Sequence, residues 1–234
     1  DIFVEREDII ITSGTQQSLD IVVKAFGCHP VKTIVISNPT YPNAINFLGD
    51  VCNIKTMDIE NDGWDMEKFE EMIKKEKIHM VYVISNFQNP TGIVWSDEKK
   101  KRLIQLAEEY DFYIIEDDCF CEFYYDDNKV YSIKSMDKSG EERVIYIRTY
   151  SKMFMPGIAL AFMIPPRKFM EKFVLIKYGL DPNTPGLNQK ILEYFITEGH
   201  LDRHLEESKK ILAAKFQKML SLLLKIPHIK ILNI

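Results

Sequence analysis

The lysine at position 152 lies in a segment whose residue types could bond covalently to a carbonyl compound. It follows an apolar run, residues 144–147, and ends the hydroxyl-rich sequence of residues 149–152, with Pro156 and Gly157 behind it. This pattern predicts a buried strand ending in a turn, where α/β proteins place reactive groups. Desolvation there would favour the neutral amine, which attacks a carbonyl to give a Schiff base. Surface lysines also follow strands often, so Lys152 alone does not establish a site.

Two other loops offer partners for a phosphorylated, charged ligand. Gly14, Thr15 and Gln16 lie between a predicted strand and a predicted helix, where backbone amides and the helix dipole favour an anion. An ordinary helix cap would have the same sequence. Asp117 follows an apolar strand, and a buried carboxylate needs a cationic or hydrogen-bonding partner. A protonated ring nitrogen would be one such partner.

Two proline-containing loops carry residues that suit an aromatic ligand. Asn89, which precedes Pro90, has an amide that can donate to a ring oxygen, although Asn-Pro is also common in plain turns. Tyr41 lies between Pro39 and Pro42 and offers an aromatic face on a stiff loop, or a partly buried anchor for that loop.

Strands and helices alternate along the chain that carries these loops. Short apolar runs predict strands at residues 9–12, 33–37, 80–84, 112–115, 144–147 and 160–164. Apolar residues at helical spacing predict helices at residues 16–26, 66–76, 98–110, 168–178 and 189–196, and Asp65 and Ser96 are candidate caps. This alternation predicts an α/β fold, a three-layer sandwich with a mostly parallel sheet covered on both faces.

The tail differs from the rest. Residues 200–224 predict one long amphipathic helix, and its expected buried stripe comprises Leu201, Leu205, Ile211, Leu212, Phe216, Met219, Leu220 and Leu223. Residues 228–234 then begin what reads as a strand. A lone strand at a chain end is unstable, so it either pairs back onto this domain or belongs to a second domain.

Composition excludes several classes of function. The chain has 234 residues, 46% of them hydrophobic, and a net charge of −5, which argues against nucleic-acid binding by this chain alone. No apolar stretch reaches membrane-spanning length and nothing resembles a signal peptide, so we expect a cytoplasmic protein without a membrane partner. The cysteines, Cys28, Cys52, Cys119 and Cys121, are expected to be free thiols. The histidines are scattered, so no metal site is predicted.

Five segments together resemble the large domain of fold-type I pyridoxal-phosphate aminotransferases of class I/II. They are ITSGTQQ at 11–17, NPTYP at 38–42, FQNPTG at 87–92, EDD at 116–118 with EF at 122–123, and TYSK at 149–152 with PG at 156–157, in family order. Within that family the chain most resembles aminoadipate-type aminotransferases and the aminotransferase-like domains of GntR-type, MocR-subfamily transcriptional regulators. The resemblance implies pyridoxal 5'-phosphate as cofactor.

The resemblance also implies a role for each matching residue. Lys152 matches the lysine that holds the cofactor as a Schiff base and moves the substrate proton, and Asp117 matches the partner of the pyridine nitrogen. Asn89 matches the contact to the ring hydroxyl and Tyr41 the aromatic that stacks on the ring. The cofactor-binding positions on the phosphate side are Gly14, Thr15, Gln16, Thr149 and Ser151.

The chain departs from the family on the phosphate side. The family has an arginine seven residues after the lysine, where this chain has Ala159, and a glycine two residues later, where it has Ala161. The arginine would make a charge-assisted contact to the phosphate. Arg148 is a candidate substitute by proximity in sequence, and an ordinary surface arginine is the alternative.

A second departure lies after the aspartate. The family commonly has a tyrosine there, where this chain has Cys119 and Phe120, neither of which replaces a phenol. Tyr124 or Tyr125 would substitute only with a differently shaped loop. The resemblance also implies a cofactor-binding large domain at residues 1–198, followed at 199–234 by a connecting helix and the start of a truncated small domain, with the arginine for the substrate carboxylate beyond residue 234.

Three functions follow from this resemblance. The eroded site and the sequence at 122–123 favour the effector-sensing domain of a MocR-type regulator, which binds the cofactor and a small amine and contacts DNA only through a domain outside this chain. The intact Asn89 favours the alternative, a working aminotransferase that moves an amino group between an amino acid and a 2-oxo acid. Ala159 motivates a third reading, a pseudo-enzyme without cofactor. The family also implies a homodimer.

Overall fold

A single twisted sheet forms the centre of the computed structural model, which describes residues 2–27, 32–124, 129–138 and 140–229. Within these residues the sheet has eight strands in the order β1-β8-β7-β6-β5-β2-β3-β4. Their bounds are β1 Ile10–Thr12, β2 Thr33–Asn38, β3 Asn53–Glu60, β4 Gly63–Trp64, β5 Met80–Val83, β6 Tyr113–Asp117, β7 Val144–Thr149 and β8 Ala161–Ile164.

The sheet is mostly parallel, as the sequence predicted. Strands β3, β2, β5, β6 and β7 pair in parallel, whereas β8 is antiparallel to both β7 and β1, and β4 is antiparallel to β3. All residues of β5 are buried, which is why its sequence is a continuous apolar run rather than an alternating one. The carboxyl ends of β1, β2, β5, β6 and β7 consequently lie at one edge.

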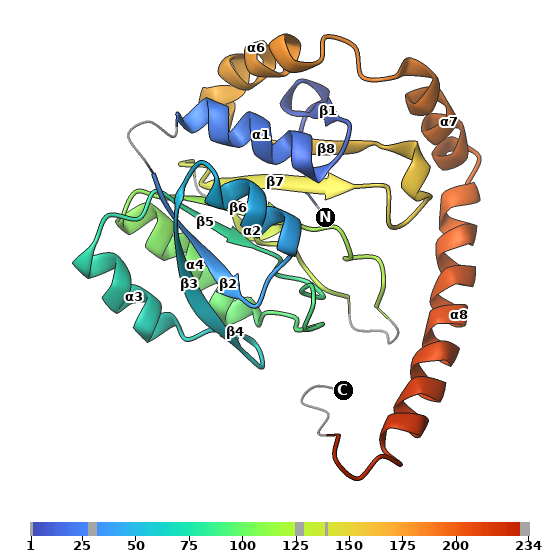
Figure 1. Cartoon of the computed structure of the whole chain (residues 1–234). Helices are drawn as coiled ribbons and strands as arrows, with labels where there is room; N and C mark the ends of the chain where they lie inside the picture. The colour runs from blue at the N-terminus through green and yellow to red at the C-terminus, as the bar shows by residue number, and fades with distance from the viewer. Residues whose placement is uncertain (1, 28–31, 125–128, 139, 230–234) are drawn as a thin grey trace.

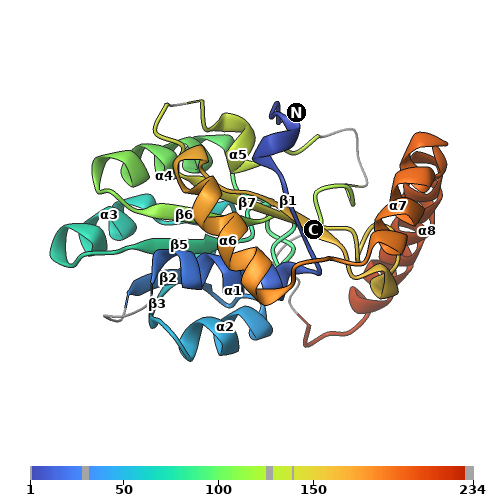
Figure 2. The ribbon, with the colours of Figure 1, turned by 90° about the horizontal axis from the view of Figure 1, so that it is seen from above.

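Helices cover both faces of the sheet, which confirms the predicted three-layer sandwich (Figure 2). One face carries α1 Thr15–Phe26, α2 Pro42–Gly49 and α6 Met170–Leu180, and the other carries α3 Met66–Lys75, α4 Asp97–Glu109 and α5 Ile133–Met136. Both predicted caps are present: the Asp65 carboxylate accepts from two backbone amides at the start of α3, and the Ser96 hydroxyl accepts from the amide of Lys99 in α4.

Two further helices lie beside the carboxyl edge. Helix α7 comprises Gly186–Thr197, and the long helix α8 comprises His200–Leu223 (Figure 1). The predicted buried stripe of α8 is wrong beyond its first two turns, because only Leu201 and Leu205 are buried. The rest of the helix extends past the packed layers, and Ile211 and Met219 are more than half exposed.

Elements with weak sequence patterns were not predicted. Helix α2 was not predicted, because Pro39 and Pro42 indicated a loop, but Pro42 occupies the first turn of the helix, where a proline costs no hydrogen bond. Strands β3 and β4 and helix α5 were also missed, as were the short 3-10 turns Arg6–Asp8, Pro156–Ile158 and Arg167–Phe169. Of the strand expected at 228–234, residues 230–234 lie outside the described residues, and 228 and 229 are not in a strand.

The described part of the chain has no helix long and apolar enough to cross a membrane.

Candidate functional site

The sheet register brings the predicted segments to one edge. Thr12 at the end of β1 pairs with Ala161, which in turn pairs with Thr149 at the end of β7. Asp117 at the end of β6 pairs with Ile147 of β7. The loops after β5 and β2, which carry the predicted ring contacts, leave the sheet at this same edge. In open α/β sheets, ligands bind outside the carboxyl ends of the strands.

A cleft of about 1270 Å³ opens at this edge, between the strand-end loops and α8. Lys152 and Asn89 both line it, together with Phe120, Phe123 and, from α8, Phe216. Lys152 is exposed, so the expectation of a desolvated lysine is wrong for the chain as described. The aromatic side chains make the rest of the cleft largely apolar, which suits a flat ring.

Asp117 is a buried carboxylate with one unused oxygen. Its side chain is 2% exposed, and the Tyr82 hydroxyl donates a hydrogen bond to Oδ2 over 2.9 Å. Oδ1 is buried and has no hydrogen-bond partner among the described residues. Burial raises the pKa of Asp117 to about 6, against the opposing effects of Tyr82 and, more weakly, of Cys119 and then Lys152. An unsatisfied buried acceptor is costly, so a donor belongs beside Oδ1.

The loop of Asn89 is fixed to the loop of Tyr41. Gln88 Nε2 donates to the backbone carbonyl of Pro39 over 2.8 Å, and Gln88 Oε1 accepts from the Thr91 hydroxyl over 2.6 Å. Tyr41 is half-buried at the start of α2, outside the lining of the cleft, and the apolar core packs against its ring. These contacts set the distance between Asn89, the predicted contact to the cofactor hydroxyl, and Tyr41, the predicted stacking residue.

The start of α1 has the features of an anion site. No side chain caps this helix, and Gly14 has a φ of 142°, which a residue with a Cβ rarely adopts. Thr15 is half-buried and Gln16 exposed at its first turn. Across the sheet edge, Thr149 Oγ1 donates to the Leu160 carbonyl and accepts from the Ser151 amide, each over 3.2 Å. The free amide end of α1 is where a phosphate is favoured.

The two candidate substitutes for missing family residues are engaged elsewhere. The Arg148 guanidinium contacts Glu122 Oε1 at 2.5 Å, in a separate hollow that Tyr146 also lines, so its geometry does not support a phosphate contact. The Tyr124 ring lies under the Lys209 ammonium at 3.8 Å and also faces that hollow. Tyr125 lies outside the described residues. Ala159 is exposed with a φ of 47°.

A buried polar network braces the strand ends from the opposite face. Lys100 Nζ donates to Asn86 Oδ1 over 2.8 Å, and Asn86 Nδ2 donates to Asp118 Oδ1 over 3.0 Å. The Tyr146 hydroxyl donates to Asp118 Oδ2 over 2.9 Å. Lys100 is only 1% exposed, and its ammonium also donates to the Tyr131 carbonyl over 2.7 Å. Burial lowers the pKa of Lys100 against the opposing charges of nearby carboxylates, Glu116 first. The brace joins α4, the loop after β5 and the end of β6.

Comparison with known proteins gives the family. Residues 2–232 match the model described as aminotransferase class I and II. The chain belongs to this family. An aromatic-amino-acid aminotransferase of Thermococcus litoralis is 33% identical over 211 residues, covering 88% of this chain and 50% of the relative. An HTH-type transcriptional regulator of Escherichia coli, YjiR, is 28% identical and covers 89% of this chain and 44% of the relative.

A solved aminotransferase carries the same fold. The α-aminoadipate aminotransferase LysN of Thermus thermophilus, complexed with N-(5'-phosphopyridoxyl)-L-leucine, aligns with a TM-score of 0.85 and 30% identity over 96% of this chain and 58% of that one. Membership of the family, with this relative, confirms the predicted cofactor, pyridoxal 5'-phosphate. The chain spans about half the length of the curated relatives it matches.

The residues present fit that cofactor. Among the described residues Asp117 Oδ1 has no donor, no side chain caps the start of α1, and Lys152 lines the largely apolar cleft beside α8. Cys119, by contrast, is buried and burial raises the pKa of its thiol, so it supplies no phenol-like donor at the position of the family's tyrosine. No group of metal-ligating residues occurs in the described ranges.

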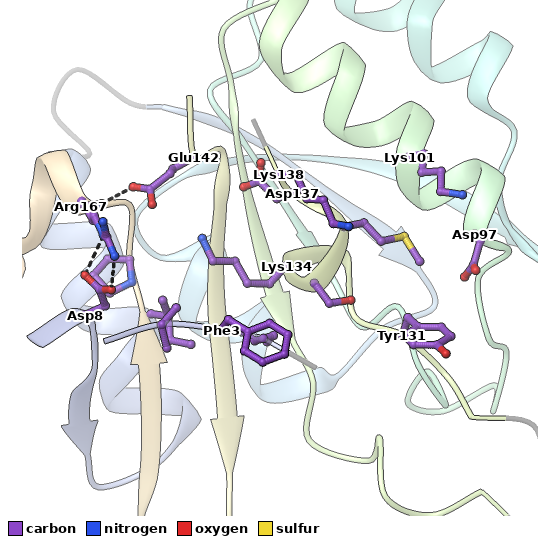
Figure 3. A pocket seen from close by; sticks show the side chains of 16 residues that line it. Phe3, Asp8, Asp97, Lys101, Tyr131, Lys134, Asp137, Lys138, Glu142 and Arg167 are labelled. Carbon is purple, nitrogen blue, oxygen red and sulfur yellow. Dashed lines mark hydrogen bonds and ion pairs between the residues drawn. The ribbon is translucent and has the colours of Figure 1, made fainter. Parts of the chain in front are cut away.

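Another hollow, of about 720 Å³, lies apart from the cleft that Lys152 lines (Figure 3). Arg167 and Asp8 form an ion pair in it, with 2.7 Å between Nη2 and Oδ2. Lys134 of α5 points into it, and Phe3 lies across it. None of the predicted site residues lines this hollow, whereas Lys152 and Asn89 line the cleft beside α8.

Sequence reasoning missed the residues that support the site from behind. Tyr82 sits in a fully buried apolar strand, and a tyrosine in such a strand usually has a partner for its hydroxyl, which was the available signal. Lys100 and Asn86 were also missed. A lysine on the apolar side of a predicted helix is a weak signal, because long lysine side chains often extend past a core to solvent.

Proposed function

We propose that this chain is the cofactor-binding platform of a class I/II aminotransferase, with residues 1–198 as its large domain. Lys152 Nζ is the attachment point for the aldehyde carbon of pyridoxal 5'-phosphate, and Asp117 Oδ1 receives the hydrogen bond of its ring nitrogen. Asn89 contacts the ring hydroxyl, and Tyr41 contacts the ring face. The observation that carries the proposal is the buried, unpaired Asp117 Oδ1, close enough to Lys152 for its charge to lower the Asp117 pKa.

Each residue has a defined chemical task. When bound, the cofactor draws electrons from the α-carbon of an attached amino acid. Asp117 would hold the ring nitrogen in its protonated form, and Lys152 Nζ would carry the α-proton of the substrate. Phe120, Phe123 and Phe216 line the cleft beside Lys152 and would contact the apolar part of a bound ligand.

The phosphate is held by neutral donors in this proposal. The amides at the start of α1 and the side chains of Thr15, Gln16, Thr149 and Ser151 supply the contacts, with Gly14 allowing close approach. Ala159 replaces the family's arginine, so the charge-assisted contact is lost. Removing the cation leaves the helix dipole as the main electrostatic attraction, which falls off within one turn.

We favour a working enzyme over a sensor. The identity of 33% to the Thermococcus aminotransferase exceeds the 28% to the Escherichia regulator, and Asn89 lies in the same cleft as Lys152. The second candidate is the effector-sensing domain of a GntR/MocR-type regulator, with DNA bound by another part of the protein. The substitutions at Ala159 and Cys119 support it, because a sensor needs only to bind the cofactor and a small amine.

Amino-group transfer distinguishes the two candidates. The chain is loaded with pyridoxal 5'-phosphate and treated with a panel of amino acids, and released 2-oxo acid is quantified beside the visible absorbance. An enzyme releases 2-oxo acid and leaves the cofactor in its amine form. A sensor changes its absorbance with an amine but releases no 2-oxo acid. Failure of every amine to change the spectrum contradicts both candidates.

We also propose that the protein is a cytoplasmic homodimer. Large apolar side chains stand exposed on α6 and α7, among them Leu175, Tyr178, Leu187 and Tyr194. Exposed apolar groups of this kind mark contact surfaces, and those of α7 lie beside the carboxyl edge that carries the proposed site. Residues 199–234 would then connect the platform to a small domain that completes the substrate site.

A further inference from the structure

Tyr82 and Asp117 form a buried pair on adjacent strands. Tyr82 of β5 lies opposite Ile115 of β6, and Asp117 follows two residues later on the same face. The tyrosine is completely buried, its ring belongs to the core beneath α1 and α2, and its hydroxyl reaches Asp117 Oδ2 at 2.9 Å. The close packing of the ring fixes the position of the hydroxyl.

This contact leaves the two carboxylate oxygens of Asp117 unequal. Oδ2 is occupied by the Tyr82 hydroxyl, and Oδ1 is buried without a hydrogen-bond partner. A carboxylate held at one oxygen does not rotate freely, so Oδ1 is presented in one orientation. The pair is therefore organised to receive one further donor at Oδ1.

We propose that Tyr82 is a positioning residue that keeps the shared proton on the ring nitrogen of the cofactor rather than on Asp117 Oδ1. The inference rests on the proposed cofactor site. A hydrogen bond from Tyr82 draws electron density from the carboxylate and makes Oδ1 a weaker base, so the ring nitrogen stays protonated. Without that hydroxyl the proton moves from the nitrogen to Oδ1, and the ion pair becomes a neutral pair.

The surroundings of Asp117 explain why this hydroxyl is needed. Burial strongly raises the Asp117 pKa, and the Asp118 carboxylate raises it further. The groups that oppose this rise are Tyr82, which acts most strongly, then Cys119 and Lys152. A desolvated carboxyl beside another carboxylate tends to take up a proton, and Tyr82 provides the largest counterweight.

The neighbouring strand supplies a matched control. The Tyr146 hydroxyl of β7 donates to Asp118 Oδ2 over 2.9 Å, the same distance as in the Tyr82 pair, and Tyr146 is also buried. Asp118 is directed to the other face, toward Asn86. Loss of either hydroxyl removes one buried hydrogen bond, but only the Tyr82 hydroxyl contacts Asp117 directly.

Nitrogen NMR of the bound cofactor tests the proposal without an activity assay. The chain, Tyr82→Phe and Tyr146→Phe are loaded with pyridoxal 5'-phosphate labelled with ¹⁵N in the ring, and the ring nitrogen shift is followed from acid to alkaline pH. We expect Tyr82→Phe, at every pH at which the pair holds one proton, to move the ring nitrogen shift toward that of the neutral nitrogen, with the proton ratio between nitrogen and Oδ1 changed about tenfold or more. Tyr146→Phe should titrate like the unchanged chain.

The outcomes separate this inference from the proposed function. Equal titration of Tyr82→Phe and the unchanged chain overturns the role of Tyr82 and leaves the cofactor site intact. A chain that holds no labelled cofactor overturns both. If Tyr82→Phe does not fold, 3,5-difluorotyrosine at position 82 serves instead: its stronger hydroxyl donor should keep the ring nitrogen shift at least as close to the protonated value as in the unchanged chain, and a move toward the neutral value contradicts the proposal.

Discussion

At the scale of single residues, Asp117 lowers the stability of the fold at neutral pH and has a proposed role in cofactor binding. Its pKa is raised from 3.8 to about 6, chiefly by burial. Between these pH values the folded chain keeps a proton that the unfolded chain has lost, so stability falls as the pH rises through this window and stays lower above it. A shift of this size corresponds to about 3 kcal/mol at neutral pH.

Asp117→Asn should remove this destabilisation and weaken the binding of the cofactor. Without cofactor, the variant should be more stable than the unchanged chain by about 2–3 kcal/mol at pH 7, with the difference vanishing near pH 3. Its affinity for pyridoxal 5'-phosphate should fall at least about tenfold, because a neutral amide does not pair with a protonated ring nitrogen. Denaturant unfolding at both pH values and a cofactor titration measure the two effects. A variant that is less stable at pH 7 would contradict this explanation.

The sequence predicted the candidate cofactor contacts better than the buried residues that support them. Lys152, Asp117 and Asn89 were found because strand ends and prolines mark them in the sequence. Their placement on one sheet edge agrees with that prediction, although their roles stay predictions. The partner of Asp117 was missed because Tyr82 lies 35 residues away, and only strand pairing brings the two together.

At the scale of elements, the brace of Lys100, Asn86 and Asp118 holds the loop after β5 against the end of β6. Lys100→Met should destabilise the fold by about 1–3 kcal/mol, because it leaves the buried Asn86 Oδ1 and the Tyr131 carbonyl without their charged donor. Lys101→Met is the matched control: Lys101 is exposed on the next position of α4, and its loss should change stability by less than about 0.5 kcal/mol. Equal unfolding midpoints in urea for the two variants would show that the brace contributes nothing.

Apolar periodicity predicted the regular helices, but it overestimated the burial of a helix that packs against few other elements. Helix α4 and its cap at Ser96 were predicted because the apolar stripe and the cap agree with each other. Helix α8 was predicted from the same kind of stripe, but only Leu201 and Leu205 are buried. A stripe shows which side of a helix can be covered and does not show whether a partner covers it.

At the scale of the whole molecule, alternating strands and helices predicted the parallel sheet and its two helical layers. The antiparallel insertion of β8 between β1 and β7 was not predicted, because strand order depends on pairing rather than on local pattern. The same limit applies to association between chains, for which the sequence offered only the family resemblance.

The proposed homodimer makes a direct prediction. Leu187→Lys should convert the dimer to a monomer, because it places a charge on an apolar residue of α7 that is 73% exposed in a single chain. Leu224→Lys is the control, since Leu224 is similarly exposed, at 66%, but lies at the far end of α8. Sedimentation velocity measures both. A monomeric unchanged chain, or a dimer that survives Leu187→Lys, would argue against this surface.

The central claim is that Lys152 holds pyridoxal 5'-phosphate, and chemical trapping tests it most directly. The chain and Lys152→Ala are mixed with the cofactor, their visible absorbance is recorded, and borohydride reduction is followed by mass mapping of the modified lysines. We predict an absorbance band and a reduced pyridoxyl group on Lys152, with the band absent from Lys152→Ala. The absence of a band, or modification spread equally over other lysines, would contradict the claim.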